Sequence, residues 1–124
     1  MEVIKLSKIR LQLLSNEWFT MVIKALEYYR ESLTYNIMPY QDDYKNEFKA
    51  VYSIVTHLIN KYEARKENLY SATKPRLIEC YHDALILRES LQYYQAQTDN
   101  NLHAPRCGSL YEELDHQIIA IENR

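Results

Sequence analysis

The chain has 124 residues, of which 15 are Lys or Arg and 17 are Asp or Glu, so its formal charge is −2. This balance argues against a generally basic nucleic-acid binder, although it is compatible with a local basic patch. With 47% apolar and 26% charged residues, the composition is globular rather than disordered. One Gly and three Pro are too few for an all-β or a Rossmann-type fold, which need more glycines at their turns.

The first half of the chain carries a helical pattern of apolar residues. Residues 3–14 predict a short first helix. From 18 to 33, apolar side chains recur at steps of three and four residues, which predicts a second helix that stops before Pro39. A long third helix is expected over 42–70, where two aspartates begin the clearest amphipathic stretch of the sequence.

The second half predicts two more helices separated by the main loop. Thr73 is suited to cap a fourth helix, with Pro75 in its first turn, where a missing N–H costs little. Residues 98–108 hold two Asn, one Pro and the only Gly of the chain, so we expect a loop there. Ser109 and Glu112 match a capping box and predict a short final helix.

These elements predict an all-α fold. We expect residues 1–124 to form a single domain, an antiparallel helical bundle of four to five helices with short connections. The apolar start of the chain is interrupted by Lys5, Lys8 and Arg10, so it fits neither a signal peptide nor a membrane span. The sequence therefore predicts a soluble, cytoplasmic protein that does not enter a membrane.

Tyrosine dominates the aromatic residues, with 12 Tyr against 2 Phe and 1 Trp. Each tyrosine carries a hydroxyl that prefers a hydrated or hydrogen-bonded position, so the pattern fits a core whose aromatic rim reaches the surface. Tyrosine is also enriched at protein interfaces. The same residues therefore predict, as the alternative, a tyrosine-rich contact surface.

Two cysteines, Cys80 and Cys107, make neither a disulfide framework nor a zinc-finger spacing, and we expect both to be reduced thiols. Cys80 falls on the apolar stripe of the expected fourth helix and should be buried. Cys107 falls in the expected loop beside Arg106 and near His103, so it should be more exposed. These neighbours could activate the Cys107 thiol mildly, but the sequence places no third catalytic group beside it.

The sequence E-x-x-H occurs twice, as Glu79 with His82 and as Glu113 with His116, and this motif binds metals in di-metal carboxylate bundles. Residues three apart share a helix face, so each pair is spaced to bind one ion. At about 100° per residue, however, both pairs lie away from the apolar stripes of their expected helices and should face solvent. We therefore predict no metal and no other cofactor.

Arg76 and His82 form an R-x5-H pattern at the start of the expected fourth helix. The pattern resembles the R-x4–6-H motif of HEPN-type ribonucleases, which are small all-helical proteins that often act as dimers. The resemblance covers these two residues alone, and Leu77 stands where the family commonly has a polar residue after the Arg. It implies that Arg76 would stabilise a phosphate and that His82 would transfer protons near neutral pH.

A basic cluster lies at the end of the expected third helix and the start of the fourth, with Tyr62 and Tyr70 interleaved. Its members are Lys61, Arg65, Lys66, Lys74 and Arg76. Such a patch could follow a phosphate backbone. Glu63 and Glu67 interrupt it, and basic residues at a helix C-terminus also interact with the helix dipole. The cluster therefore predicts either a nucleic-acid site or a solvated helix end.

We expect a non-enzymatic helical interaction module that associates into a homo-oligomer and binds a protein partner. No catalytic group can be placed on a core-facing or cleft position, and broad apolar faces with surplus tyrosine suit helix association. The alternative is a nucleic-acid-binding helical protein that uses the basic cluster. A HEPN-like ribonuclease with Arg76 and His82 would be the enzymatic form of that alternative.

Overall fold

The all-α class is confirmed by a computed structural model, which describes residues 8–13, 16–37, 42–67 and 76–123. In chain order the elements are β1 (Lys8–Gln12), α2 (Asn16–Ile37), α3 (Asp42–Glu67), β2 (Arg76–Cys80), α4 (Tyr81–Gln97) and α5 (His103–Glu122). Among the helices of these described ranges, none combines the length and the apolar character needed to cross a membrane.

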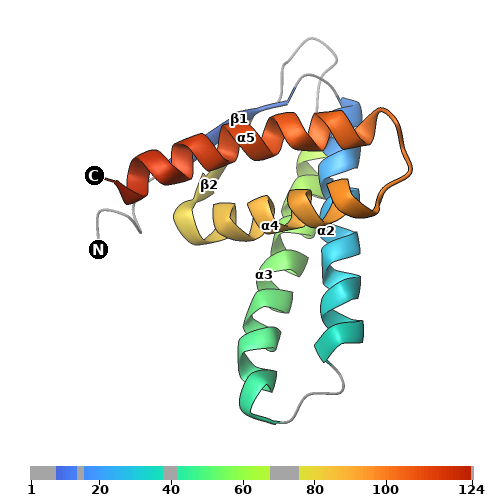
Figure 1. The fold of residues 1–124 in the computed structure, drawn as a ribbon, viewed down its shortest axis with the longest axis vertical. Coiled ribbons are helices and arrows are strands. Elements are labelled where there is room, and N and C mark those ends of the chain that lie inside the picture. Colours follow the sequence, from blue (N-terminus) through green and yellow to red (C-terminus); the bar gives the residue numbers. More distant parts are fainter. Residues whose placement is uncertain (1–7, 14–15, 38–41, 68–75, 124) are drawn as a thin grey trace.

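The four helices form two antiparallel pairs that cross one another (Figure 1). α2 and α3 run along the long axis of the molecule, and α4 and α5 lie across their upper half in this view. α5 also runs beside β1. The expected arrangement of all helices in one antiparallel bundle is therefore not confirmed, although α2 with α3 and α4 with α5 each form an antiparallel pair.

One continuous hydrophobic core joins β1 to all four helices. Its largest fully buried side chains are Tyr62, Tyr94, Phe19, Ile9, Leu11, Leu13, Met21, Leu26, Leu58, Leu87 and Leu91. Buried residues of the helices recur at steps of three and four, as in Phe19, Val22 and Leu26 of α2 and in Val55, Leu58 and Tyr62 of α3, which places them on one face of each helix. The apolar stripe expected over 18–33 thus corresponds to the buried face of α2. Of the stripe expected over 42–70, Val55, Leu58, Ile59 and Tyr62 are buried in α3 and Tyr52 is 43% exposed. Residues 68–70 lie outside the described part of the chain.

The start of the chain is a strand where we expected a helix over 3–14. β1 pairs antiparallel with β2, from Lys8 opposite Cys80 to Gln12 opposite Arg76. The reason lies in a period of two: Ile9 and Leu11 are buried and the residues between them are polar, which puts alternate side chains on opposite faces of a strand. Residues 3–7 lie outside the described part of the chain.

The expected fourth helix begins later than its sequence pattern predicts. Residues 76–80 form β2, and the helix starts only at Tyr81. Pairing with β1 overrides the local helical pattern here, because strand preference depends on the neighbouring strand. The correction reverses two expectations: Glu79, expected in solvent, is 3% exposed, and Cys80, expected in the core, is exposed. Thr73 and Pro75 lie outside the described residues.

The outer edge of β1 is closed by a side chain of α5. The backbone N–H of Arg10 donates to Oε1 of Gln117 at 3.0 Å, and Nε2 of Gln117 donates to the carbonyl of Arg10 at 2.8 Å. One amide thus satisfies both backbone groups of a strand residue that turns away from β2. This pair of bonds holds α5 against the sheet.

The final helix is longer than expected, because α5 begins at His103 and includes residues assigned to the loop 98–108. Oδ1 of Asn100 accepts the N–H groups of Leu102 at 2.9 Å and of His103 at 3.0 Å, so Asn100 supplies the cap that we had assigned to Ser109. Pro105 lies in the first turn of α5, where its missing N–H costs little.

Two loop residues of the sequence prediction are in fact helical and packed against the rest of the protein. A Cβ atom on Gly108 would lie 2.9 Å from Nε2 of Gln95, so the missing side chain lets α5 approach α4 closely. Cys107, expected to be exposed, is fully buried. Burial raises the pKa of the Cys107 thiol to about 12, so this thiol stays protonated at neutral pH.

The two thiols should therefore differ in reactivity. In the native protein we expect Ellman's reagent to modify one thiol per chain quickly, because Cys80 is exposed and Cys107 is buried. Cys80→Ser should abolish the fast phase, and a denaturant should then release the second thiol. A fast phase that persists in Cys80→Ser would contradict the burial of Cys107.

Candidate functional site

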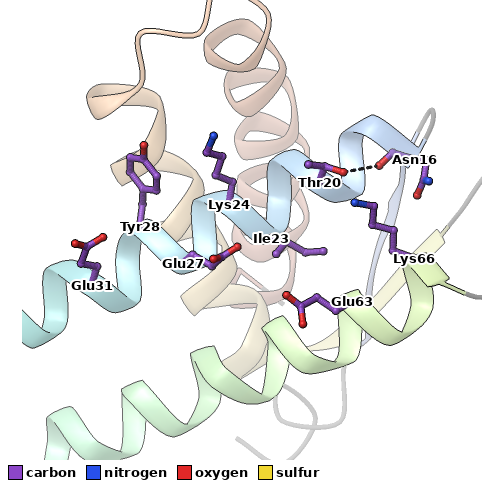
Figure 2. Close-up of a pocket in the computed structure, with 9 residues that line it drawn as sticks. All are labelled: Asn16, Thr20, Ile23, Lys24, Glu27, Tyr28, Glu31, Glu63 and Lys66. Carbon is purple, nitrogen blue, oxygen red and sulfur yellow. Dashed lines mark hydrogen bonds between the residues drawn. The ribbon is translucent and has the colours of Figure 1, made fainter.

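A groove runs along α2 beside the C-terminal half of α3 (Figure 2), with a volume of 780 Å³. Its lining residues are Asn16, Thr20, Ile23, Lys24, Glu27, Tyr28, Glu31, Glu63 and Lys66. The volume falls in the range typical of ligand sites, roughly 300–1,000 Å³. Eight of the nine lining residues are charged or polar, so the groove offers charged groups to a ligand together with the apolar stems of the same side chains.

The helical period of α2 explains why these side chains share a face. Thr20, Lys24, Glu27 and Glu31 follow at steps of three and four residues, so they form one stripe. The stripe lies on the opposite side of α2 from the core residues Phe19, Val22 and Leu26, at about 100° per residue. α3 adds two residues three positions apart, which belong to a single face of that helix.

The charges of the groove differ between its two ends. Figure 2 shows Lys66 near Asn16, while Glu63 points across from α3 toward α2 and Glu31 lies near Tyr28. Among the described residues, the five charged side chains of the groove form no ion pair or hydrogen bond with one another or with other side chains. Their charges are therefore open to a ligand.

A second polar site is buried beneath the sheet. Oε1 of Glu79 accepts hydrogen bonds from the Tyr62 hydroxyl at 2.5 Å and from Nζ of Lys61 at 2.8 Å. The other oxygen, Oε2, is buried without a hydrogen-bond partner. Burial, and then the Glu79 carboxylate, raise the pKa of Tyr62 well above its ordinary value, so its hydroxyl remains a donor. The cluster links α3 to β2.

The two E-x-x-H pairs do not come together as a metal site. Glu79 faces inward from β2, whereas His82, Glu113 and His116 are exposed on the helices. In the described ranges, no group of three His, Cys, Asp or Glu side chains is arranged to hold a metal ion. The expectation that both pairs face solvent is thus wrong for Glu79 alone, because its position is set by strand alternation rather than by a helix.

The structure divides the predicted basic cluster. Lys61 forms an ion pair with Glu79, Arg65 is exposed on α3, and Lys66 lines the groove. Lys74 lies outside the described residues, and Arg76 begins β2. One of the three cations placed on α3 is thus already neutralised by a buried carboxylate, which sequence spacing could not reveal.

The R-x5-H residues are not on one helix, although we expected both at the start of the fourth helix. Arg76 is the first residue of β2, and four strand steps, about 13 Å, separate it from Cys80 at the other end of the strand. His82 follows in the first turn of α4, where it is exposed and its ring lies 5.5 Å from that of Tyr81. Arg76 of the motif therefore lies on a strand, and His82 lies at the start of a helix.

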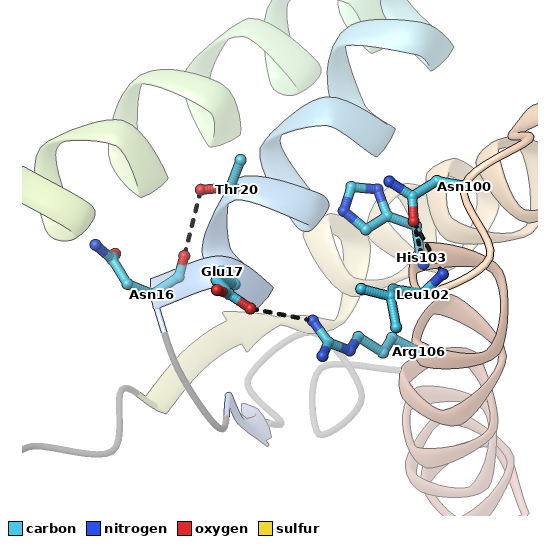
Figure 3. A network of polar contacts seen from close by, with 7 residues as sticks. All are labelled: Asn16, Glu17, Thr20, Asn100, Leu102, His103 and Arg106. Carbon is cyan, nitrogen blue, oxygen red and sulfur yellow. Dashed lines mark hydrogen bonds and ion pairs between the residues drawn. The ribbon is translucent and has the colours of Figure 1, made fainter.

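Polar contacts fasten α2 to the start of α5 (Figure 3). Nη1 of Arg106 lies 3.6 Å from Oε2 of Glu17, and its guanidinium stands 5.3 Å from the Trp18 ring. His103 shares a hydrogen bond of 2.7 Å between its Nδ1 and the Tyr94 hydroxyl. Burial, and then the nearby cations of α2 and α5, lower the pKa of His103.

A comparison of the chain with protein-family models, with curated proteins and with solved structures finds no match. The groove and the Glu79 cluster were not predicted from the sequence. The alternation of Lys8, Ile9, Arg10 and Leu11 was the signal that predicts a strand there, although not its partner.

The Tyr62–Glu79 hydrogen bond should contribute measurably to stability. We expect Tyr62→Phe to lower the free energy of unfolding by about 2 kcal/mol, because it removes a hydrogen bond to a buried carboxylate. Tyr52→Phe, which removes the hydroxyl of an exposed ring, is the control and should change stability by less than about 0.5 kcal/mol. Equal losses in urea denaturation would contradict the role of this bond.

His103 should make stability depend on pH. Because its folded-state pKa lies below the ordinary value of 6.5, the unfolded chain takes up a proton first as the pH falls. The stabilisation is therefore complete above that value and is lost as the pH falls through the folded-state pKa. Between about pH 7 and pH 5, the unfolding free energy of the wild type should fall more steeply than that of His103→Gln. Parallel curves would refute this.

Proposed function

We propose that this chain is a non-enzymatic helical interaction module that forms a homo-oligomer and binds a protein partner. The observation that carries this proposal is an exposed aromatic and cationic surface on the α2–α3 arm. We use "arm" for the C-terminal half of α2 with the N-terminal half of α3, which extend beyond α4 and α5 in Figure 1.

The arm has apolar side chains that two helices alone bury incompletely. Leu33 is buried, but Val51 and Ile54 are only partly buried and Tyr52 is 43% exposed. A helix must bury its apolar stripe against another element, and a pair of helices leaves part of each stripe uncovered. A second copy of the arm would supply the missing layer by completing a four-helix arrangement.

Contacts within the chain restrain the side chains of Tyr52 and Arg30. The Arg30 guanidinium lies 5.8 Å from the centre of the Tyr52 ring, and Nη1 of Arg30 donates to Oγ1 of Thr56 at 3.3 Å. Tyrosine and arginine are among the residues most often found at the energetic centres of interfaces. Because contacts within the chain already restrain both side chains, less conformational entropy is lost when a partner binds.

The candidate reactive groups do not favour catalysis. The Cys107 thiol, with a pKa of about 12, is protonated at neutral pH and is therefore a poor nucleophile. His82 is exposed on the first turn of α4 rather than set in a cleft. These positions support a binding role over an enzymatic one.

Size-exclusion chromatography with light scattering tests the proposal. The wild type should elute with the mass of two or more chains, and Tyr52→Ala should shift it toward the mass of one chain because it removes the exposed ring of the arm. Ile119→Ala, which truncates an exposed apolar side chain on α5, is the matched control and should keep the wild-type mass.

A wild type that remains a monomer at every concentration would overturn the self-association. Absorbance at two wavelengths during the same run reports any nucleic acid that copurifies. A peak with excess nucleic-acid absorbance that disappears when Lys61, Arg65 and Lys66 are changed to Ala would instead favour the nucleic-acid-binding alternative.

A further inference from the structure

The groove on α2 cannot be filled by the same surface of a second copy. Across a two-fold axis a surface meets itself, and two hollow surfaces leave a void between them. A macromolecule that fills the groove, 780 Å³ in volume, must therefore do so with a protruding segment. On α2 the groove extends from Asn16 to Glu31 and so overlaps the start of the arm, but it does not include Arg30 or Tyr52, the residues proposed to meet a second copy.

The charges of the groove favour a cationic occupant. Three carboxylates face two ammonium groups, and Glu27 and Glu63 approach the same space from α2 and from α3. Tyr28 stands beside them, 39% exposed, with its ring packed 4.9 Å from that of Tyr94. Carboxylates bind lysine and arginine by charge-assisted hydrogen bonds, and a fixed tyrosine ring adds a face for the same cations.

We propose that this groove docks a lysine- or arginine-bearing segment of a protein partner. The cationic side chains of that segment meet Glu27, Glu31 and Glu63, and Tyr28 contacts the stem or the charge of one of them. Lys66 at the other end, beside Asn16, sets the direction of the segment, because it repels the cations of the segment and attracts an anionic side chain. Lys24 lies between Thr20 and Tyr28 and limits how many cations the groove accepts. The inference rests on the proposed function and gives the chemistry of the protein partner.

Other occupants fit the charges less well. A divalent metal ion needs several ligands at one point, and no three His, Cys, Asp or Glu side chains of the described residues are arranged to supply them. A nucleic acid would bring its phosphates against the three glutamates, which repel them. A peptide segment spreads its charges along the groove and matches the carboxylates one by one.

Octalysine is the probe for this proposal, with octaglutamate as the probe of opposite charge. At low salt, amide chemical shifts of isotope-labelled protein should move in residues 16–31 and 63–66 on addition of octalysine, and the effect should weaken with salt. The double substitution Glu27→Gln with Glu63→Gln should weaken binding about tenfold, because it removes two charge-assisted partners.

The matched control is Glu89→Gln with Glu112→Gln, which removes two exposed carboxylates of α4 and α5 and gives the same net charge. It should weaken octalysine binding less than about twofold. Equal losses in the two double variants would mean general attraction to an acidic protein and would overturn the proposal. Shifts outside the groove, or tighter binding of octaglutamate, would overturn it as well.

A measurement of the oligomer mass distinguishes the groove proposal from the proposed self-association through the arm. Both double variants should keep the wild-type mass in light scattering, because neither changes Tyr52 or Arg30, the residues of the arm proposed to meet a second copy. An oligomer that fails to bind octalysine in the groove would refute the groove alone. A monomer that binds octalysine there would refute self-association and leave the groove standing.

Discussion

The antiparallel pairing of β1 with β2 is the constraint on which the rest of the structure depends. It places Ile9 opposite Glu79 and thereby turns a carboxylate toward the core. A buried carboxylate is costly unless it is hydrogen-bonded and paired, and Tyr62 and Lys61 of α3 supply those partners. The same pairing leaves the outer edge of β1 free to bond with Gln117 of α5. Glu79 thus binds α3 to the sheet, and Arg10 binds α5.

Much of the fold could be predicted from the sequence, because α2 and α3 are long and their apolar residues repeat with the helical period. The strands were not predicted. Residues 8–12 alternate between polar and apolar side chains, which indicates a strand, but Leu77 and Ile78 are neighbours in β2 and fit a helix equally well. Only the partner strand decides between these readings, and a partner far along the chain is invisible to a local pattern.

The beginning of α5 shows a different limit. From the sequence we expected Ser109 to cap this helix, because it matches a capping box with Glu112, and residues 98–108 to form a loop. The structure selects Asn100, since its side chain bonds two backbone N–H groups and Pro105 then falls in the first turn. Because α5 starts early, Cys107 and Gly108 pack against the rest of the protein instead of lying in a loop.

The candidate site was less predictable than the fold. Each charged residue of the groove reads in the sequence as part of the solvated face of an amphipathic helix, and that is correct for α2 taken alone. The hollow arises from the position of α3, which the periodicity of α2 cannot specify. For the same reason the sequence could not show that Lys61 differs from the rest of the basic cluster, because its ion pair with Glu79 depends on the position of β2.

The amide of Gln117 has a consequence for the behaviour of the protein at high concentration. An uncovered strand edge is a template on which a strand from another molecule can add, and repeated addition builds a cross-β fibre. On β1 the hydrogen-bonding groups at the middle of that edge are already occupied by a side chain of α5. A strand can add at this edge only after Gln117 of α5 releases the backbone of Arg10. Resistance to fibre formation therefore depends on the docking of α5.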